Sequence, residues 1–305
     1  MLDVSRRIIG AVLCVLALLL PGCSMVRVGY GQAPDLLFWW LDGYADFNAE
    51  QTPKVRDALD GFFRWHRRTQ LNDYAALLQR AQAQFAGNVT AGEVCAWQDE
   101  FSRRLDMAVE QALPAVAEIA PSLSAAQFAH IERKFAKVND ELKADFAPAD
   151  RAERQRQALK RWSERFESMY GPLSDTQHSA VARGVAASPS DSEVWIGERQ
   201  ARQREVLQTL RGMAGGAATN AAANTSANPA GGRANREASL RALAERSRSS
   251  PRAAYNAYAQ RVAEHNCRLV AELHNSTTAA QRERALARLK GWEEDLRALA
   301  VQGAP

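Results

Sequence analysis

Apolar side chains recur at intervals of three and four residues along nearly the whole chain after residue 35. This spacing places them on one face of an α-helix, and no segment alternates convincingly as a half-buried strand would. The clearest run is Phe128, Ile131, Phe135, Val138, Leu142 and Phe146, and similar runs include Val94, Trp97, Phe101 and Leu105, and Leu159, Trp162, Phe166 and Met169. We therefore expect an all-α fold, a multi-helix bundle of amphipathic helices.

Five short elements predict where helices begin. Each has Asn, Ser or Thr followed three residues later by Gln or Glu: Asn48 and Gln51, Thr90 and Glu93, Ser124 and Gln127, Ser174 and Gln177, and Thr278 and Gln281. In such a capping box each of the two side chains accepts a hydrogen bond from the backbone N–H of the other residue. The unequal spacing of the five elements argues against a regular solenoid, so we interpret them as helix caps.

The first 22 residues have the pattern of a signal peptide. Arg6 and Arg7 precede an apolar run of 13 residues, 8–20, whereas a membrane-spanning helix needs about 20. The run ends in Leu20-Pro21-Gly22-Cys23, which is similar to the lipobox of bacterial lipoproteins. That resemblance implies cleavage before Cys23 and attachment of a diacylglycerol and a further acyl chain, such as palmitate, to this residue. The alternative is an ordinary signal peptide that is cut nearby.

The residues after Cys23 predict where in the cell envelope the protein is located. In lipoproteins of this kind a serine such as Ser24 implies passage to the outer membrane, so we expect a lipid anchor on its periplasmic face. Residues 23–34 contain two glycines and a proline and show no helical period. We therefore predict that they form a flexible tether, short enough to keep the folded body close to the membrane.

Composition divides the rest of the chain into two helical parts. Residues 35–211 predict a helical domain, and residues 237–300 predict C-terminal helices that pack back on it. Between them, residues 212–236 are low in complexity, lack aromatic residues and carry hardly any charge, so we predict a disordered linker. The alternative is that the last helices form a separate hairpin.

The net charge of the chain limits the kinds of partner that it is expected to bind. Without the three charged residues of the signal segment, the chain has 37 basic and 34 acidic residues, a net charge of +3. These charges are interleaved, as on solvated helix faces, so we expect no nucleic-acid partner.

Beside Cys23, the mature chain has only Cys95 and Cys267, which we expect to form a disulfide in an oxidising compartment. The alternative is two separate buried thiols.

Several aromatic elements resemble a family of uncharacterised proteobacterial lipoproteins. Its members have a Trp-rich first helix ending in a D-x-[LF]-[ST]-x-x-Q cap, a W-H-R stretch and a W-I-G-x-R-x-x-Q-like element. The corresponding segments here are residues 30–51, Trp65-His66-Arg67 and residues 195–203, although Asn48 stands where Ser or Thr is commoner. The resemblance covers roughly residues 30–211 and implies a helical fold. It implies no chemistry, because the family has no assigned activity.

Trp39 and Trp40 are the first candidates for a binding surface, because they follow the predicted tether directly. In one interpretation an interfacial helix dips these rings into lipid headgroups. Large aromatic side chains mostly pack inside proteins, so we expect one tryptophan and the neighbouring leucines to face the core.

Two basic–aromatic clusters are further candidates. One contains Trp65, His66, Arg67 and Arg68, and the other contains Lys160, Arg161 and Trp162. Arginines bind phosphates and carboxylates through bidentate hydrogen bonds, so these clusters are candidates to hold an envelope polymer. The alternative interpretation, which we prefer, places the tryptophans in the core and the arginines in water.

The sequence contains no recognisable catalytic or metal-binding motif: no H-E-x-x-H, G-x-S-x-G, Walker loop or dinucleotide fingerprint. We therefore expect no catalytic residues, no metal and no cofactor. The preferred hypothesis is a non-catalytic lipoprotein that binds another envelope protein or an envelope polymer as an adaptor or structural component. The capped Leu-Ser-x-x-Gln elements also resemble repeats of ATP-independent periplasmic chaperones, so a holdase is the alternative. A cell-wall or lipid-modifying enzyme is the third hypothesis.

Overall fold

The computed structural model describes residues 25–222 and 229–302, and within them the chain forms helices and no strand. The all-α expectation is therefore confirmed. The α-helices are α2 (Met25–Gly31), α3 (Ala33–Ala45), α4 (Gln51–Thr69), α5 (Leu71–Phe85), α6 (Ala91–Ile119), α7 (Ala125–Phe146), α8 (Arg151–Tyr170), α9 (Asp175–Ala186), α10 (Ser192–Ala222), α11 (Pro229–Arg248), α12 (Ala253–Asn275) and α13 (Ala279–Val301). A 3-10 turn, η1 (Ala120–Ser122), joins α6 to α7.

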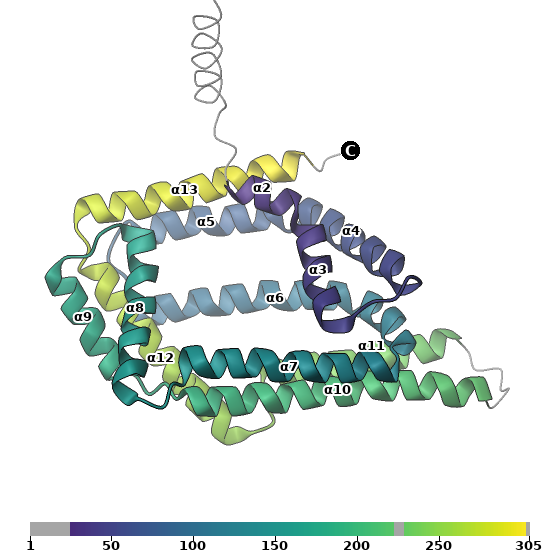
Figure 1. Ribbon diagram of the computed structural model, residues 1–305. Helices are drawn as coiled ribbons and strands as arrows, with labels where there is room; N and C mark the ends of the chain where they lie inside the picture. The colour runs from purple at the N-terminus through teal and green to yellow at the C-terminus, as the bar shows by residue number, and fades with distance from the viewer. Residues whose placement is uncertain (1–24, 223–228, 303–305) are drawn as a thin grey trace, which may run out of the picture.

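The helices form the sides of a frame (Figure 1). Helices α5 and α13 lie side by side along its top, α8 and α9 form the left side, and α7 and α10 run together along the bottom. Helices α3 and α4 close the right side, and α6 crosses behind the opening, where it packs on α11 and α12. Helix α11, which begins within the predicted linker, and the two helices after it pack on earlier ones: α11 and α12 on α6, and α13 on α5 and α8.

Hydrophobic packing is distributed around this frame. One cluster joins α8, α9, α12 and α13, and it includes Phe166, Val181 and Leu273. A second joins α6 to α10 and α11 through Leu113, Ala117, Met213 and Leu240, while two smaller clusters join α3 to α4 and α7 to α10. Each fully buried leucine or valine contributes about 1.5–3 kcal/mol. Stability therefore resides in the corners and sides of the frame.

All five predicted capping boxes are present. At Thr90, Ser124, Ser174 and Thr278 the side chain accepts a hydrogen bond from the backbone N–H three residues on, and the third residue's side chain accepts one in return. Asn48 and Gln51 exchange the same two bonds at the start of α4. These boxes satisfy backbone donors that a helix leaves free at its N-terminus.

The cap glutamines also pair with one another, which the sequence did not reveal. Gln177 and Gln281 donate to each other's side-chain oxygens at 2.9 and 3.0 Å. Each also donates across to the loop before the other's cap, Gln177 to the carbonyl oxygen of Ser276 and Gln281 to that of Pro172.

Gln51 and Gln127 repeat this arrangement. They too exchange side-chain hydrogen bonds, and Gln51 donates to the carbonyl of Ser122 while Gln127 donates to that of Asp46. All four glutamines are buried. The two pairs therefore join α9 to α13 and α4 to α7 at their N-termini.

The structure corrects two expectations about flexible segments. The predicted tether, 23–34, is helical from Met25 and is held by an ion pair of 2.8 Å between Arg27 and Asp295. The predicted linker, 212–236, is helical up to Ala222 and again from Pro229. Alanine is the strongest helix former, so an alanine-rich segment continues a helix once a side chain such as Met213 is buried against α6.

Residues 1–24, including the predicted signal peptide, Cys23 and Ser24, lie outside the described residues. Among the helices that the structure describes, none combines the length and the apolar character needed to cross a membrane.

Candidate functional site

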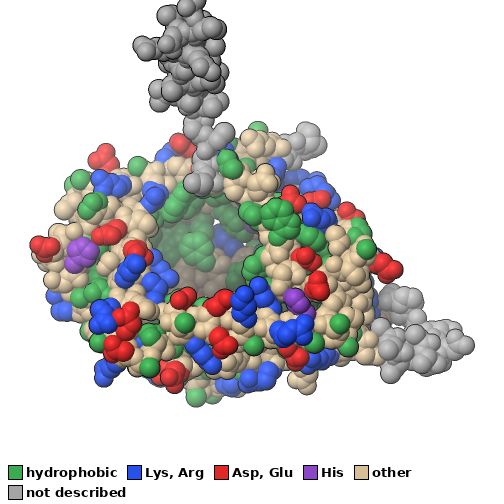
Figure 2. All heavy atoms as spheres, viewed as in Figure 1, with side chains coloured by type: hydrophobic (Ala, Val, Ile, Leu, Met, Phe, Trp, Pro, Cys, Tyr) green, Lys and Arg blue, Asp and Glu red, His purple; other side chains and the backbone are tan. Residues whose placement is uncertain are grey.

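The frame encloses a hollow, and hydrophobic side chains cover its floor (Figure 2). The floor includes a stripe on α6, which we call the floor stripe, formed by Val94, Trp97, Phe101 and Leu105. Phe101 and Leu105 are 61% and 65% exposed, so nothing in the described chain covers them. The groove along this stripe is completed by residues of α12, among them Asn266 and Val270. An exposed apolar stripe of this kind is typical of a protein-binding surface.

Neighbouring contacts fix which side of α6 faces the hollow. One side of α6 faces α5, where Arg104 forms an ion pair of 2.8 Å with Asp73 and the Trp97 indole donates to Gln84. The other side carries the Cys95–Cys267 disulfide to α12, with 5.5 Å between the Cα atoms, which confirms the predicted pairing. Within the floor stripe, Trp97 lies at the edge next to α5, and the other three residues lie between the two sides. The stripe therefore points into the space that the frame encloses.

The left wall of the hollow is basic (Figure 2). Helix α8 carries Arg151, Arg154, Arg161 and Arg165 at helical spacing along one side, and we call these four residues the arginine stripe. Burial and the neighbouring Arg165 lower the pKa of Arg161, whose guanidinium lies 4.4 Å from the centre of the Phe146 ring. Asn266 lines both this basic wall and the apolar groove, so the two surfaces are continuous.

The predicted cluster at Arg161 and Trp162 lines the basic wall, and its tryptophan also packs against the core. The Trp162 ring stacks on Phe166 at 5.5 Å and packs against the core of the left side, as the alternative interpretation held. Arg161 lines the same wall and donates a hydrogen bond to the backbone carbonyl of Asp145. The other three members of the arginine stripe were not singled out in the sequence, although their spacing of three, seven and four residues would have placed them on one helix face.

Both Trp39 and Trp40 are exposed, by 62% and 60%. The expectation that one of them faces the core is therefore wrong, because Phe38 occupies that position against α4, with Leu37 and Leu41 packed beside it. Trp40 contacts Tyr44 at 4.9 Å between ring centres, next to the contact between α3 and α7. Helix α3 thus places exposed aromatic side chains on the right side of the frame (Figure 1).

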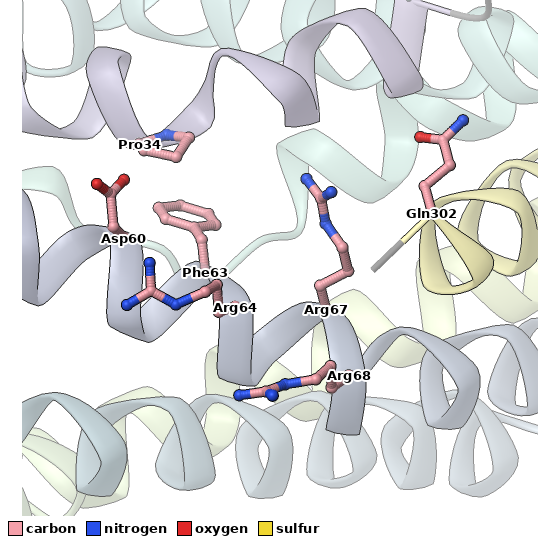
Figure 3. Close-up of a pocket in the computed structure, with 7 residues that line it drawn as sticks. All are labelled: Pro34, Asp60, Phe63, Arg64, Arg67, Arg68 and Gln302. Atoms are coloured by element: carbon pink, nitrogen blue, oxygen red, sulfur yellow. The ribbon is translucent and has the colours of Figure 1, made fainter. Parts of the chain in front are cut away.

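The cluster at Trp65, Arg67 and Arg68 lies on the opposite side of the frame from Arg161, so the structure does not bring the two basic–aromatic clusters together (Figure 1). The Trp65 ring packs on Phe62 at 5.6 Å between ring centres. Arg67 and Arg68 line a shallow groove together with Pro34, Asp60, Phe63, Arg64 and Gln302 (Figure 3). Asp60 lies in the same groove as the three arginines. Its negative charge reduces the attraction of the groove for an anion.

His274, which is buried, and His66, which is half-buried, each have hydrogen-bond partners at both ring nitrogens. His274 lies between the Tyr170 hydroxyl, 2.9 Å from Nδ1, and the carbonyl oxygen of Gly87, 2.8 Å from Nε2. His66 lies in the same way between the hydroxyls of Tyr30 and Tyr74. Burial lowers the pKa of both histidines and raises the pKa of Tyr170 to about 12. These groups hold helices together and present no free ring nitrogen to a substrate.

Glu198 on α10 has the most strongly lowered carboxyl pKa in the described chain. It is 5% exposed and accepts hydrogen bonds from Arg252 at 2.5 and 2.9 Å and from Arg202 at 2.9 Å. Hydrogen bonds from Arg252 lower the pKa of Glu198 to about 2. Glu205 also binds Arg252, so the group is an ion network that ties α10 to the start of α12. Elsewhere in the described residues, no group of three or more His, Cys, Asp or Glu is placed to hold a metal ion.

Comparison with known proteins identifies the family to which this sequence belongs. The sequence model of DUF6279, described as a family of unknown function, matches residues 43–223. The chain belongs to this family. The match runs from the end of α3 through α10, so it includes α6 and α8, while α11, α12 and α13 follow it. No curated protein and no solved structure matches the chain.

Proposed function

We propose that the protein is a non-catalytic component of the cell envelope, anchored by lipid at Cys23 to the outer membrane on its periplasmic face. In this proposal the frame binds a segment of another envelope protein in its central hollow. The observation that carries the proposal is the exposed floor stripe, with Phe101 and Leu105 more than half exposed inside a concave surface.

Physical chemistry supports a partner at this position. Fully burying one exposed phenylalanine or leucine contributes about 1.5–3 kcal/mol, and two such residues, Phe101 and Leu105, lie side by side here. The walls of the frame restrict the approach to segments that fit between α3 and α8, which favours a discrete partner (Figure 2). A protein segment fits this surface better than a polysaccharide, because the floor is apolar.

Site-specific photo-cross-linking in intact cells tests the proposal. A photoreactive amino acid at Phe101 should capture one or two envelope proteins reproducibly. The matched control is the same amino acid at Lys160, which is exposed on the outer side of α8 and should capture neither. Equal yields of the same products from both positions, or no product from Phe101, would show that the hollow holds no partner.

A second candidate function is that of an ATP-independent holdase, and the exposed apolar floor favours it as well. A holdase would yield many unrelated cross-linked proteins from Phe101, and their number would rise under unfolding stress. The purified protein would also suppress the aggregation of thermally unfolded malate dehydrogenase, and Phe101→Gln would weaken that effect. If Phe101 cross-links to only one or two proteins, and the purified protein does not suppress aggregation, the results would exclude the holdase and support the adaptor function.

A further inference from the structure

The two sides of α8 differ in how their charges are paired. On the outer side, Arg156 forms an ion pair with Glu153, and Lys160 lies 3.9 Å from Glu164. On the side that faces the hollow, no described carboxylate oxygen lies within 4.0 Å of a guanidinium nitrogen of the arginine stripe, although the charge of Asp145 attracts Arg161 at longer range. Arg154 and Arg161 donate only to backbone carbonyls, those of Pro148 and Asp145 among them.

Four arginines without an ion-pair partner mark a surface that is complementary to negative charge. Two carboxylates, Asp191 and Glu193, also line this wall. Asp191 accepts hydrogen bonds from the backbone N–H groups of Glu193 and Val194 at the start of α10, so it serves as a helix cap. The remaining excess of positive charge faces the hollow.

The floor stripe has the geometry of a helix-binding ridge. Its residues recur at intervals of three and four from Val94 to Leu105, so they extend along about 17 Å of α6 at 1.5 Å per residue. Ridges of this spacing pack into the grooves of another helix, and a helix of about three turns would cover the stripe. The arginine stripe continues this surface through Asn266, and so it would contact one flank of such a helix.

We propose that the hollow binds an acidic amphipathic helix of the partner protein. Its apolar face lies on the floor stripe, and its carboxylates on one flank bind the arginine stripe. This inference rests on the proposed function, and it adds the chemistry of the partner segment. A flat anionic membrane fits less well, because the arginine stripe lines a groove together with Asn266 of α12, and basic side chains lie along the left wall of the hollow (Figure 2).

The test uses the purified protein and two fluorescent 14-residue peptides. Both have the same apolar residues at helical spacing, and one carries four glutamates on a flank where the other carries four lysines. Fluorescence anisotropy should show that the acidic peptide binds at least tenfold more tightly than the basic one, with an affinity that falls as salt is raised. Arg161→Glu with Arg165→Glu should abolish this preference.

The matched control is Arg156→Glu with Lys160→Glu, which makes the same change in charge on the outer side of the same helix. It should change the affinity for the acidic peptide less than twofold at moderate salt, because these positions are distant from the peptide and screened. Circular dichroism and thermal melting of each variant establish that it is folded. If the double glutamate variant is unfolded, Arg161→Gln with Arg165→Gln replaces it and should reduce the affinity at least threefold.

The outcomes separate this inference from the proposed function. Equal binding of the two peptides, or no binding of the acidic one, would overturn the inference, while cross-linking of a discrete partner from Phe101 would leave the function in place. Loss of both the peptide binding and the cross-linked product would overturn the two together. Binding to phosphatidylglycerol vesicles that the arginine variants abolish, without peptide binding, would assign the surface to lipid and also overturn the inference.

Discussion

The four cap glutamines make more hydrogen bonds than a capping box requires. Within its own box each glutamine uses its side-chain oxygen, and across the pair it uses its side-chain nitrogen. A buried amide left without partners costs free energy, so these reciprocal bonds tie each helix start to one particular neighbour. The sequence predicts the local box, whereas only the folded chain determines which two boxes meet.

Replacing one glutamine should therefore affect two helix starts. Gln281→Ala removes the acceptor of the Thr278 N–H and leaves the buried Gln177 without its partner. We expect the free energy of unfolding to fall by about 1–3 kcal/mol, measured by urea denaturation. Gln98→Ala, at an exposed position, is the control and should change it by less than about 0.5 kcal/mol. Equal effects of the two substitutions would contradict the role of the pair.

The Glu198 network should make stability depend on pH in the acid range. The pKa of Glu198 is about 2 in the folded protein and about 4.5 without its partners. Its contribution is therefore fully present above pH 4.5 and is lost as the pH falls towards 2. Glu198→Gln should destabilise the protein by about 1–3 kcal/mol at pH 7, and this difference should shrink steadily between pH 4.5 and 2. Thermal melting over this range measures it, and a constant difference would disprove the assignment.

At the scale of elements, α6 shows why a helical stripe does not by itself identify a core. Val94, Trp97, Phe101 and Leu105 have the same periodicity as the stripe on α7. On α7, Phe128 and Ile131 are buried against α10, yet on α6 Phe101 and Leu105 remain open. Periodicity indicates which residues share a face, while the path of other helices decides whether that face is covered.

The Cys95–Cys267 disulfide should stabilise the junction of α6 and α12. It links residues 172 positions apart, so it restricts the unfolded chain and contributes about 2–4 kcal/mol. Cys95→Ser with Cys267→Ser should lower the free energy of unfolding by this amount, and reduction of the wild type should have the same effect. The double variant, which reduction leaves unchanged, is the control. Two alkylatable thiols in the oxidised native protein would contradict the bond.

At the scale of the whole molecule, the frame separates stability from binding. The buried clusters lie in its sides and corners, and the hollow exposes the floor stripe and the arginine stripe. Residues on the surface of the hollow can therefore be substituted at little cost in stability. A loss of binding in the arginine-stripe variants would then reflect the lost contact and not unfolding.

The proposed lipid anchor at Cys23 belongs to this scale, because it would determine where in the cell the frame lies. Cys23→Ala should either leave the signal peptide uncleaved or release the protein from membranes, since the acylated thiol is lost. Cell fractionation and mass spectrometry of the N-terminus measure the outcome. Cys14→Ala, within the apolar signal segment, is the control and should still yield the lipidated protein. A Cys23→Ala protein that is cleaved and remains in the membrane fraction would refute the anchor.

The sequence by itself determined the helical class and the helix starts, since both depend on interactions between residues three or four positions apart. It also indicated the Cys95–Cys267 pair, because only two cysteines remain after Cys23. It misjudged residues 25–31 and 212–222, where local composition predicted flexibility and contacts with distant helices stabilise a helix.

Only the tertiary structure decided which faces meet. The pairing of the cap glutamines, the exposure of Trp39 and Trp40, and the position of the arginine stripe beside the apolar floor all depend on contacts between helices distant in sequence. Such contacts follow from how the helices close into a frame around the hollow, and no local pattern specifies that closure.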